Sequence, residues 1–125
     1  MSSLTAKNQP SKENILDKYQ QIVKDTHIHE FHDFNLLYFS NGLGGECGEV
    51  QNEIKKLYRE MIKDNESVNV SKIKKRKENI KTELGDVMWY LTAIVNDLGF
   101  SLEDILKGSI KKCHTFVDWK KNYSN

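Results

Sequence analysis

The chain has 125 residues, of which 38% are apolar and 30% are charged. This length fits a single domain. The formal net charge is +1 with both signs interspersed, so the composition predicts neither nucleic acid nor a membrane surface as a partner. No apolar run approaches the roughly 18 residues of a membrane-spanning helix. The two cysteines lie far apart and lack metal-binding spacing, which is typical of reduced thiols. We therefore expect a cytoplasmic protein.

The N-terminal part predicts one helix. Residues 1–10 lack the apolar stretch of a signal peptide and are expected to form a flexible tail. Ser11 is a good N-cap, and apolar residues at helical spacing predict a helix over residues 11–24. The segment THIHEFHD then predicts a loop. Its three histidines are not accompanied by cysteines or by acidic residues at the spacing of zinc ligands, which favours an exposed surface over a zinc site.

A second helix is expected to start near Phe34, and its glycines need an explanation. Residues 41–50, NGLGGECGEV, contain four glycines, although each costs about 1 kcal/mol relative to alanine inside a helix. A phosphate-binding glycine loop does not fit, because the segment is acidic, follows no strand and lacks the Lys-Ser/Thr pair. We expect that side chains at Gly45 and Gly48 would crowd a metal ion, a ligand or the facing helix. Helix packing through small residues explains the glycines equally well.

The C-terminal half predicts two more helices. The polar, lysine-rich residues 63–78 are expected to form an exposed loop. Apolar residues at helical spacing then predict a third helix over residues 80–98. Gly99 ends it, and Ser101 caps a fourth helix that continues to about residue 119. Since no period-2 alternation occurs, the sequence predicts one all-α domain over residues 11–122.

Two acidic pairs carry the strongest functional signal. Glu46 and Glu49 stand three residues apart on the second helix, and Glu83 and Asp86 repeat this spacing on the third. Both pairs border apolar stripes, where an uncompensated carboxylate is costly, so we expect a cation between them. An all-oxygen ligand set favours Mg²⁺, Mn²⁺ or Ca²⁺ over zinc, and the lack of Glu-x-x-His motifs argues against a di-iron bundle. Four carboxylates around one or two such ions form a plausible phosphate-cleaving site.

In combination, Glu46-Cys-Gly-Glu49 and Glu83-Leu-Gly-Asp86 resemble the E-x-x-E and E-x-x-D signature of the MazG-like nucleoside triphosphate pyrophosphohydrolases. This family includes the dimeric dUTPases and the dCTP pyrophosphatases. The segments GLGGECGEV, EIKK, ELGDVMWYL and LGFSLEDIL extend the resemblance over residues 31–112. It implies a four-helix MazG-like bundle that is completed by homo-oligomerisation, as a homodimer or homotetramer. It also implies hydrolysis of (d)NTP to (d)NMP and pyrophosphate with Mg²⁺, or with Mn²⁺ in its place, in nucleotide-pool cleansing.

The resemblance also implies roles for individual residues. Glu46, Glu49, Glu83 and Asp86 match the metal ligands, and one glutamate of the first pair is the expected catalytic base that accepts a proton from the attacking water. Weaker candidates for contacts with the substrate are Glu53, Tyr90, Lys112, His32, Asn35 and Lys56.

A second hypothesis is a non-catalytic helical dimer that binds nucleotides or a partner protein. The complete set of four carboxylates favours the enzyme, because a protein that only binds would be free to lose one of them. Residues 87–91, VMWYL, are apolar without a break, which is more apolar surface than three short neighbouring helices can cover. We therefore expect contact with a second copy of the chain at or near Trp89.

Overall fold

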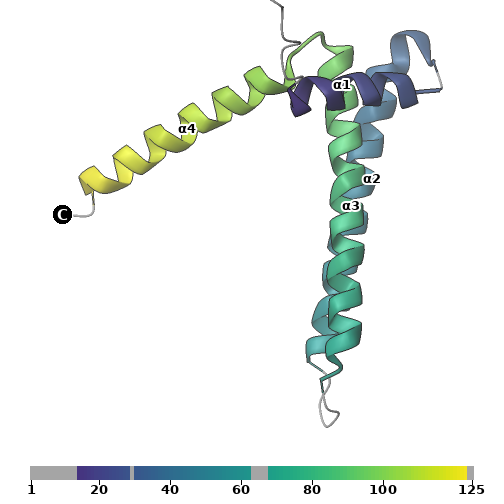
Figure 1. Cartoon of the computed structure of the whole chain (residues 1–125), viewed down its shortest axis with the longest axis vertical. Helices are drawn as coiled ribbons and strands as arrows, with labels where there is room; N and C mark the ends of the chain where they lie inside the picture. The colour runs from purple at the N-terminus through teal and green to yellow at the C-terminus, as the bar shows by residue number, and fades with distance from the viewer. Residues whose placement is uncertain (1–13, 29, 63–67, 124–125) are drawn as a thin grey trace, which may run out of the picture.

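The structure is a computed structural model that describes residues 14–28, 30–62 and 68–123. The described residues form four α-helices and one short 3₁₀ helix and contain no strand, which confirms the predicted all-α class (Figure 1). In chain order the elements are α1 (Ile15–Thr26), η1 (His32–Phe34), α2 (Asn35–Met61), α3 (Val70–Asp97) and α4 (Leu102–Tyr123).

Helix α1 lies across one end of the long α2/α3 hairpin (Figure 1). Asn14 is its N-cap and accepts a hydrogen bond from the backbone N–H of Leu16, whereas the predicted cap, Ser11, lies outside the described residues together with the expected tail. The helix is tied to α3 by one side chain in its middle and one at its C-terminal end. Gln20 Nε2 donates to Asn96 Oδ1 at 2.9 Å, and the indole N–H of Trp89 donates to the hydroxyl of Thr26 at 2.9 Å.

Helices α2 and α3 run antiparallel and side by side (Figure 1). Three pairs mark the seam between them: Phe39 with Ala93, Glu46 with Asp86, and Glu53 with Asn79. Each step of seven residues along α2 is thus matched by seven residues in the opposite direction along α3. Seven residues are close to two helical turns, so one face of each helix meets the other along the whole seam. This seam sets which side chains can share a site.

The prediction of a loop over residues 63–78 was wrong for its second part. Helix α3 begins at Val70, with Asn69 as its N-cap, so residues 70–78 are helical, while residues 63–67 lie outside the described part of the chain. Lysine, arginine and glutamate are good helix formers. The segment also continues the seam, because Ile73 and Arg76 are partly buried. The prediction used polarity alone, and it therefore missed a helical segment that packs on α2 through charged side chains.

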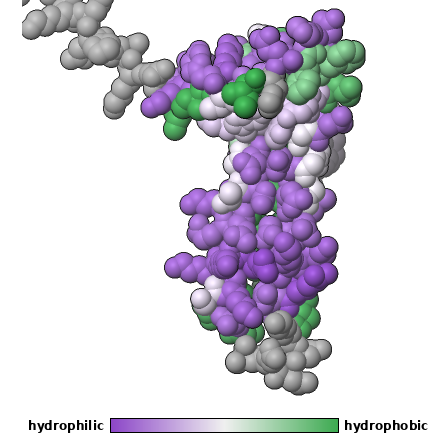
Figure 2. Space-filling view, turned by 90° about the vertical axis from the view of Figure 1, so that its right-hand side faces the viewer, coloured by the Kyte–Doolittle hydropathy of each residue, from purple (hydrophilic) through white to green (hydrophobic). Residues whose placement is uncertain are grey.

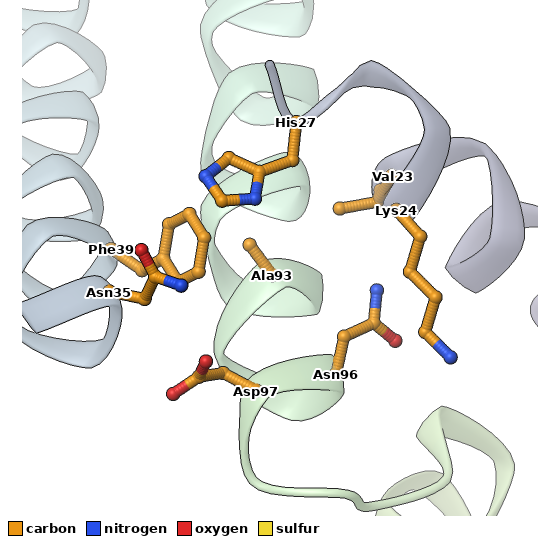
Figure 3. Close-up of a pocket in the computed structure, with 8 residues that line it drawn as sticks. All are labelled: Val23, Lys24, His27, Asn35, Phe39, Ala93, Asn96 and Asp97. Atoms are coloured by element: carbon orange, nitrogen blue, oxygen red, sulfur yellow. The ribbon is translucent and has the colours of Figure 1, made fainter. Parts of the chain in front are cut away.

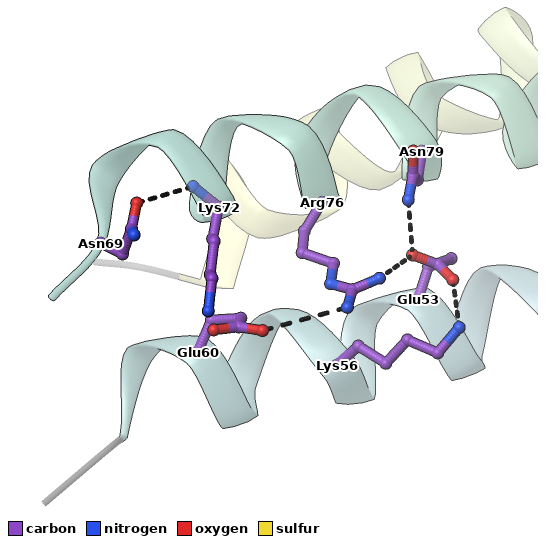
Figure 4. Close-up of polar contacts among 7 residues, drawn as sticks. All are labelled: Glu53, Lys56, Glu60, Asn69, Lys72, Arg76 and Asn79. Atoms are coloured by element: carbon purple, nitrogen blue, oxygen red, sulfur yellow. Dashed lines mark hydrogen bonds and ion pairs between the residues drawn. The ribbon is translucent and has the colours of Figure 1, made fainter.

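Glu53 is the most buried charged residue of this hairpin, with 6% of its surface exposed. Its carboxylate lies 2.5 Å from Lys56 Nζ, 3.2 Å from Asn79 Nδ2 and 3.4 Å from Arg76 Nη1 (Figure 4). The hydrogen bond from Lys56 lowers the pKa of Glu53 below its ordinary value. Burial acts in the opposite direction, but the bond from Asn79 and the charges of Lys56 and Arg76 add to the lowering. Glu53 therefore remains ionised and joins the two helices.

The corner between α3 and α4 follows the prediction. Gly99 has a φ of +72°, in the left-handed region that favours glycine, and Ser101 Oγ accepts a hydrogen bond from the backbone N–H of Asp104. Leu102 is buried, and its N–H donates to Gln20 Oε1 of α1. Beyond this first turn α4 projects away from the other helices (Figure 1).

The apolar core within one chain is small. The buried apolar residues among those described are Val23, Phe39, Ala93, Val95 and Leu102. The VMWYL segment is only partly covered within the chain, since Met88 is 42% exposed. Figure 2 shows hydrophilic side chains over the middle of the hairpin and hydrophobic ones near both of its ends. None of the described helices is long and apolar enough to cross a membrane.

We predict that Glu53→Gln lowers the melting temperature at neutral pH. The pKa of Glu53 is lower in the folded chain than in the unfolded chain, so its ionised form stabilises the fold above the unfolded pKa. That stabilisation is lost as the pH falls through the folded pKa. Melting curves from neutral to acidic pH should therefore show a difference between the wild type and Glu53→Gln that shrinks in acid. Glu78→Gln, at an exposed site on α3, is the control, and an equal effect of both substitutions would contradict the assignment.

Candidate active site

Three carboxylates meet across the middle of the seam. Glu46 on α2 and Glu83 and Asp86 on α3 each offer one oxygen, and these oxygens all lie within 4.8 Å of one another. Glu46 and Glu83 are half-buried, while Asp86 is more exposed. The i, i+3 spacing on α3 places its two carboxylates on one face, and the seam places Glu46 opposite them. Three hard oxygen donors at this spacing suit a divalent cation.

The acidic cluster formed by Glu46, Glu83 and Asp86 carries uncompensated negative charge. Burial raises the pKa of Glu46 above its ordinary value, and the charges of Asp86, Glu83 and Glu49 raise it further. Burial also raises the pKa of the Tyr90 hydroxyl, to which the charges of Glu46 and Asp86 add. A cation bound at the cluster would remove this repulsion, so the donor set fits a metal ion.

Glu49 is the fourth predicted metal ligand, and it lies outside this three-residue cluster. Its side chain is exposed on α2, one turn after Glu46, and its charge contributes to the raised pKa of Glu46. The structure thus brings together three of the four predicted carboxylates and keeps the fourth nearby. The role of Glu49 as a metal ligand stays a prediction.

An open hollow of about 400 Å³ adjoins the acidic cluster. Glu46, Asp86, Trp89 and Tyr90 line it. The rings of Trp89 and Tyr90 have centroids 5.0 Å apart in an edge-to-face arrangement, and they give the hollow an aromatic wall. Tyr90, a candidate for contact with the substrate, therefore stands beside the carboxylates, where a ligand held by a cation would meet it.

The glycines of α2 fall into two groups. A Cβ atom at Gly42 would overlap the ring of Tyr90, so this glycine lets the aromatic wall approach the helix backbone. A Cβ atom at Gly44, Gly45 or Gly48 would meet nothing within 4 Å in the described chain. Crowding by the facing helix of the same chain, one of the expected reasons for Gly45 and Gly48, was therefore wrong. A ligand, a metal ion or a second copy remains as the reason for those two.

The other candidates for contact with the substrate lie away from the acidic cluster. Glu53 and Lys56 bind each other two turns further along the seam. Lys112 is exposed on the projecting part of α4 (Figure 1). His32 is exposed in η1 with a φ of +51°, and Asn35 begins α2 at the opposite end of the seam from Glu53. Within one chain, none of these five side chains lines the acidic hollow.

A second, smaller hollow of about 170 Å³ lies between α1, α2 and α3 (Figure 3). Its lining residues are Val23, Lys24, His27, Asn35, Phe39, Ala93, Asn96 and Asp97. His27 was expected at an exposed surface, but its ring packs edge-on against Phe39, with centroids 4.8 Å apart, and that expectation was wrong. Asp97 was not among the predicted site residues. The antiparallel alignment of α2 and α3 indicates it, because Asn35 and Asp97 each lie four residues, about one helical turn, beyond Phe39 and Ala93.

Comparison with known proteins identifies the family. The MazG nucleotide pyrophosphohydrolase domain matches residues 35–116, which includes the acidic cluster and most of the four-helix fold. The chain therefore belongs to the MazG nucleotide pyrophosphohydrolase family. It is also 32% identical over 83 residues to the Gene 37 protein of Mycobacterium phage L5, covering 66% of this chain and 67% of that protein. No solved structure shows a significant match.

We predict opposite effects for alanine at two glycines of α2. Gly42→Ala should lower the free energy of unfolding by about 1–3 kcal/mol, because the new methyl group displaces the Tyr90 ring. Gly48→Ala should raise it by up to about 1 kcal/mol, because alanine favours the helix and meets no neighbour. Denaturant unfolding without metal or nucleotide measures both. Equal effects of the two substitutions would contradict the contact between Gly42 and Tyr90.

Proposed function

We propose that the chain is a Mg²⁺-dependent nucleoside triphosphate pyrophosphohydrolase that converts (d)NTP to (d)NMP and pyrophosphate, with Mn²⁺ able to replace Mg²⁺. The observation that carries the proposal is the acidic cluster, in which three carboxylates converge beside an aromatic hollow in a chain of this family. A nucleotide-pool cleansing role and a cytoplasmic address are part of the proposal and rest on the resemblance and the composition.

Glu46, Glu83 and Asp86 would hold the metal, with Glu49 as a fourth ligand from one turn away. When bound, Mg²⁺ supplies positive charge that neutralises the triphosphate and favours attack by water. The proton of the attacking water would pass to Glu46, a member of the acidic cluster, or to Glu49, one turn away from it. Tyr90 and Trp89 would hold the nucleotide against the carboxylates from the aromatic side.

We also propose that the active form is a homodimer or a homotetramer. Apolar side chains are exposed on every long helix of the chain, among them Tyr58, Leu84, Met88, Ile110 and Trp119. An exposed apolar surface of this extent marks an interface. Trp89 itself donates to Thr26 and packs against the core within its own chain, so its neighbour Met88 is the residue at this position that is free to contact a second copy.

The direct test is incubation with a panel of canonical and modified (d)NTPs and Mg²⁺, followed by separation of the products. We expect (d)NMP and pyrophosphate. Release of NDP and orthophosphate would overturn the proposed cleavage site. Nucleotide binding without turnover of any nucleotide would instead support the alternative, a non-catalytic helical dimer.

Asp86→Asn is expected to lower turnover by at least about 100-fold without unfolding the chain. Glu49→Gln is expected to abolish turnover, also without unfolding the chain. Removing one negative charge relieves repulsion within the acidic cluster, so the melting temperature without Mg²⁺ should hold or rise. The rise in melting temperature on adding Mg²⁺ should shrink. Glu78→Gln is the matched control on α3. Loss of the fold together with activity would mean that these carboxylates are structural.

Light scattering at micromolar concentration should give a mass of at least twice the 14.6 kDa of one chain. Met88→Glu places a charge on the exposed apolar face of α3 and should lower the measured mass. Lys81→Glu, at an exposed position seven residues earlier on the same face, is the control. A stable and active 14.6 kDa monomer would refute the proposed assembly.

A further inference from the structure

We propose that the basic end of the α2/α3 hairpin binds the phosphate backbone of double-stranded nucleic acid without reading its sequence. The basic end consists of residues 55–62, where α2 ends, and residues 70–81, where α3 begins. The inference goes beyond the proposed activity, because none of these residues lines the hollow at the acidic cluster.

Positive charge is concentrated at this end of the hairpin. Its 20 residues contain nine of the 19 lysines and arginines of the chain but two of the 18 acidic residues, Glu60 and Glu78. The remaining residues are therefore acidic overall, and the formal net charge of +1 hides two regions of opposite sign. A strongly negative partner would be attracted to the basic end and repelled by the rest of the chain, including the acidic cluster.

Three lysines form a row on the outer face of α3. Lys74, Lys77 and Lys81 follow i, i+3, i+7 spacing, so at about 100° per residue they lie within about 60° of one another. All three are exposed, and none forms an ion pair with a residue that the structure describes. Arg76, by contrast, turns toward α2 and pairs with glutamates there (Figure 4). The charge of the lysine row is thus available to a ligand.

The composition of this face suits a phosphate backbone better than a protein or a membrane. After Val70, the first residue of α3, the exposed positions up to residue 81 hold five lysines, one serine and one glutamate. The core of a protein interface is apolar or aromatic, and a helix that lies in a membrane surface needs a broad apolar face. Lysine meets phosphate as a compact charge and reads no base, so the expected binding is independent of sequence.

A duplex fits this face better than a single strand. Proteins that hold single strands stack the bases on aromatic side chains, and the one aromatic residue of the basic end, Tyr58, is on the other helix. A duplex requires only charge, because each strand presents one phosphate per roughly 3.4 Å of the axis. The lysine row extends about 10 Å along α3, which corresponds to about three phosphates of one strand.

The first experiment measures the binding of the full chain to a short, fluorescently labelled DNA duplex, without Mg²⁺ or nucleotide. We expect a dissociation constant of roughly 10⁻⁶–10⁻⁴ M at physiological salt, equal for duplexes of unrelated sequence. Three neutralised phosphates should make the affinity fall about 40-fold between about 50 and 200 mM salt. Absence of binding at the lower salt concentration, or binding that salt does not weaken, would overturn the inference.

The second experiment removes two charges from the lysine row. The double variant Lys74→Gln, Lys77→Gln should weaken binding at low salt by at least about tenfold for every duplex and lower the salt slope by about two. Lys74→Arg with Lys77→Arg keeps the charge and should bind like the wild type. The matched control is Lys18→Gln with Lys111→Gln, two exposed lysines on α1 and α4. Equal weakening by both glutamine pairs would show an effect of net charge alone and overturn the assignment.

The third experiment compares other partners of negative charge. Single-stranded DNA and vesicles that contain phosphatidylserine should bind more weakly than the duplex, and tighter binding of either would overturn the choice of partner. An equimolar nucleoside triphosphate should not displace the duplex. Displacement would assign the lysine row to the phosphates of the substrate instead.

The inference and the proposed function fail separately in these experiments. The glutamine pair at Lys74 and Lys77 should leave turnover of (d)NTPs unchanged, because neither residue lines the acidic hollow. Turnover without duplex binding would refute the inference and leave the proposed activity intact. Duplex binding that depends on the lysine row, without turnover of any nucleotide, would support the inference and refute the activity.

Discussion

The register of α2 against α3 holds three like charges together, and the remaining features of the site depend on it. At one level of the seam Phe39 and Ala93 are buried against each other, and two heptads away Glu53 is surrounded by donors from both helices. The level between them carries the acidic cluster, whose carboxylates repel one another. Favourable contacts on both sides therefore keep an unfavourable one in place. This is the arrangement expected where a protein stores local instability at a functional site.

The same register explains why two glutamates on one helix face have different roles. Glu46 and Glu53 are seven residues apart and both face α3, but their partners differ. Burial raises the pKa of Glu46, and the carboxylates opposite raise it further. The hydrogen bond from Lys56 lowers the pKa of Glu53, and the amide and guanidinium opposite add to the lowering. A raised pKa marks a carboxylate that lacks a positive partner in the described chain, and a lowered pKa marks a carboxylate that has a positive partner.

Much of this architecture could be predicted from the sequence. Helical spacing, the glycine at position 99 and the cap at Ser101 located α3 and α4, and the repeated acidic spacing located the cluster. The helix over residues 70–78 was missed, because its stability comes from Arg76 meeting Glu53 on another helix rather than from an apolar stripe. The roles of Gly42 and His27 were missed for a related reason. Spacing assigns a residue to a face of its helix, but which side chain it meets depends on how two distant segments are aligned.

Helix α4 has 22 residues, and beyond its first turn it extends away from the hairpin that carries the acidic cluster. At 1.5 Å per residue it spans about 33 Å, and Lys112 lies about halfway along it, exposed and beyond the part of α4 that packs on the rest of the described chain. If Lys112 contacts the substrate as predicted, it would do so in the site of another copy of the proposed assembly. A subunit with a defect in α4 and a subunit with a defect in the acidic cluster would then complement each other. Subunits that are each inactive alone would form a working site when they are mixed.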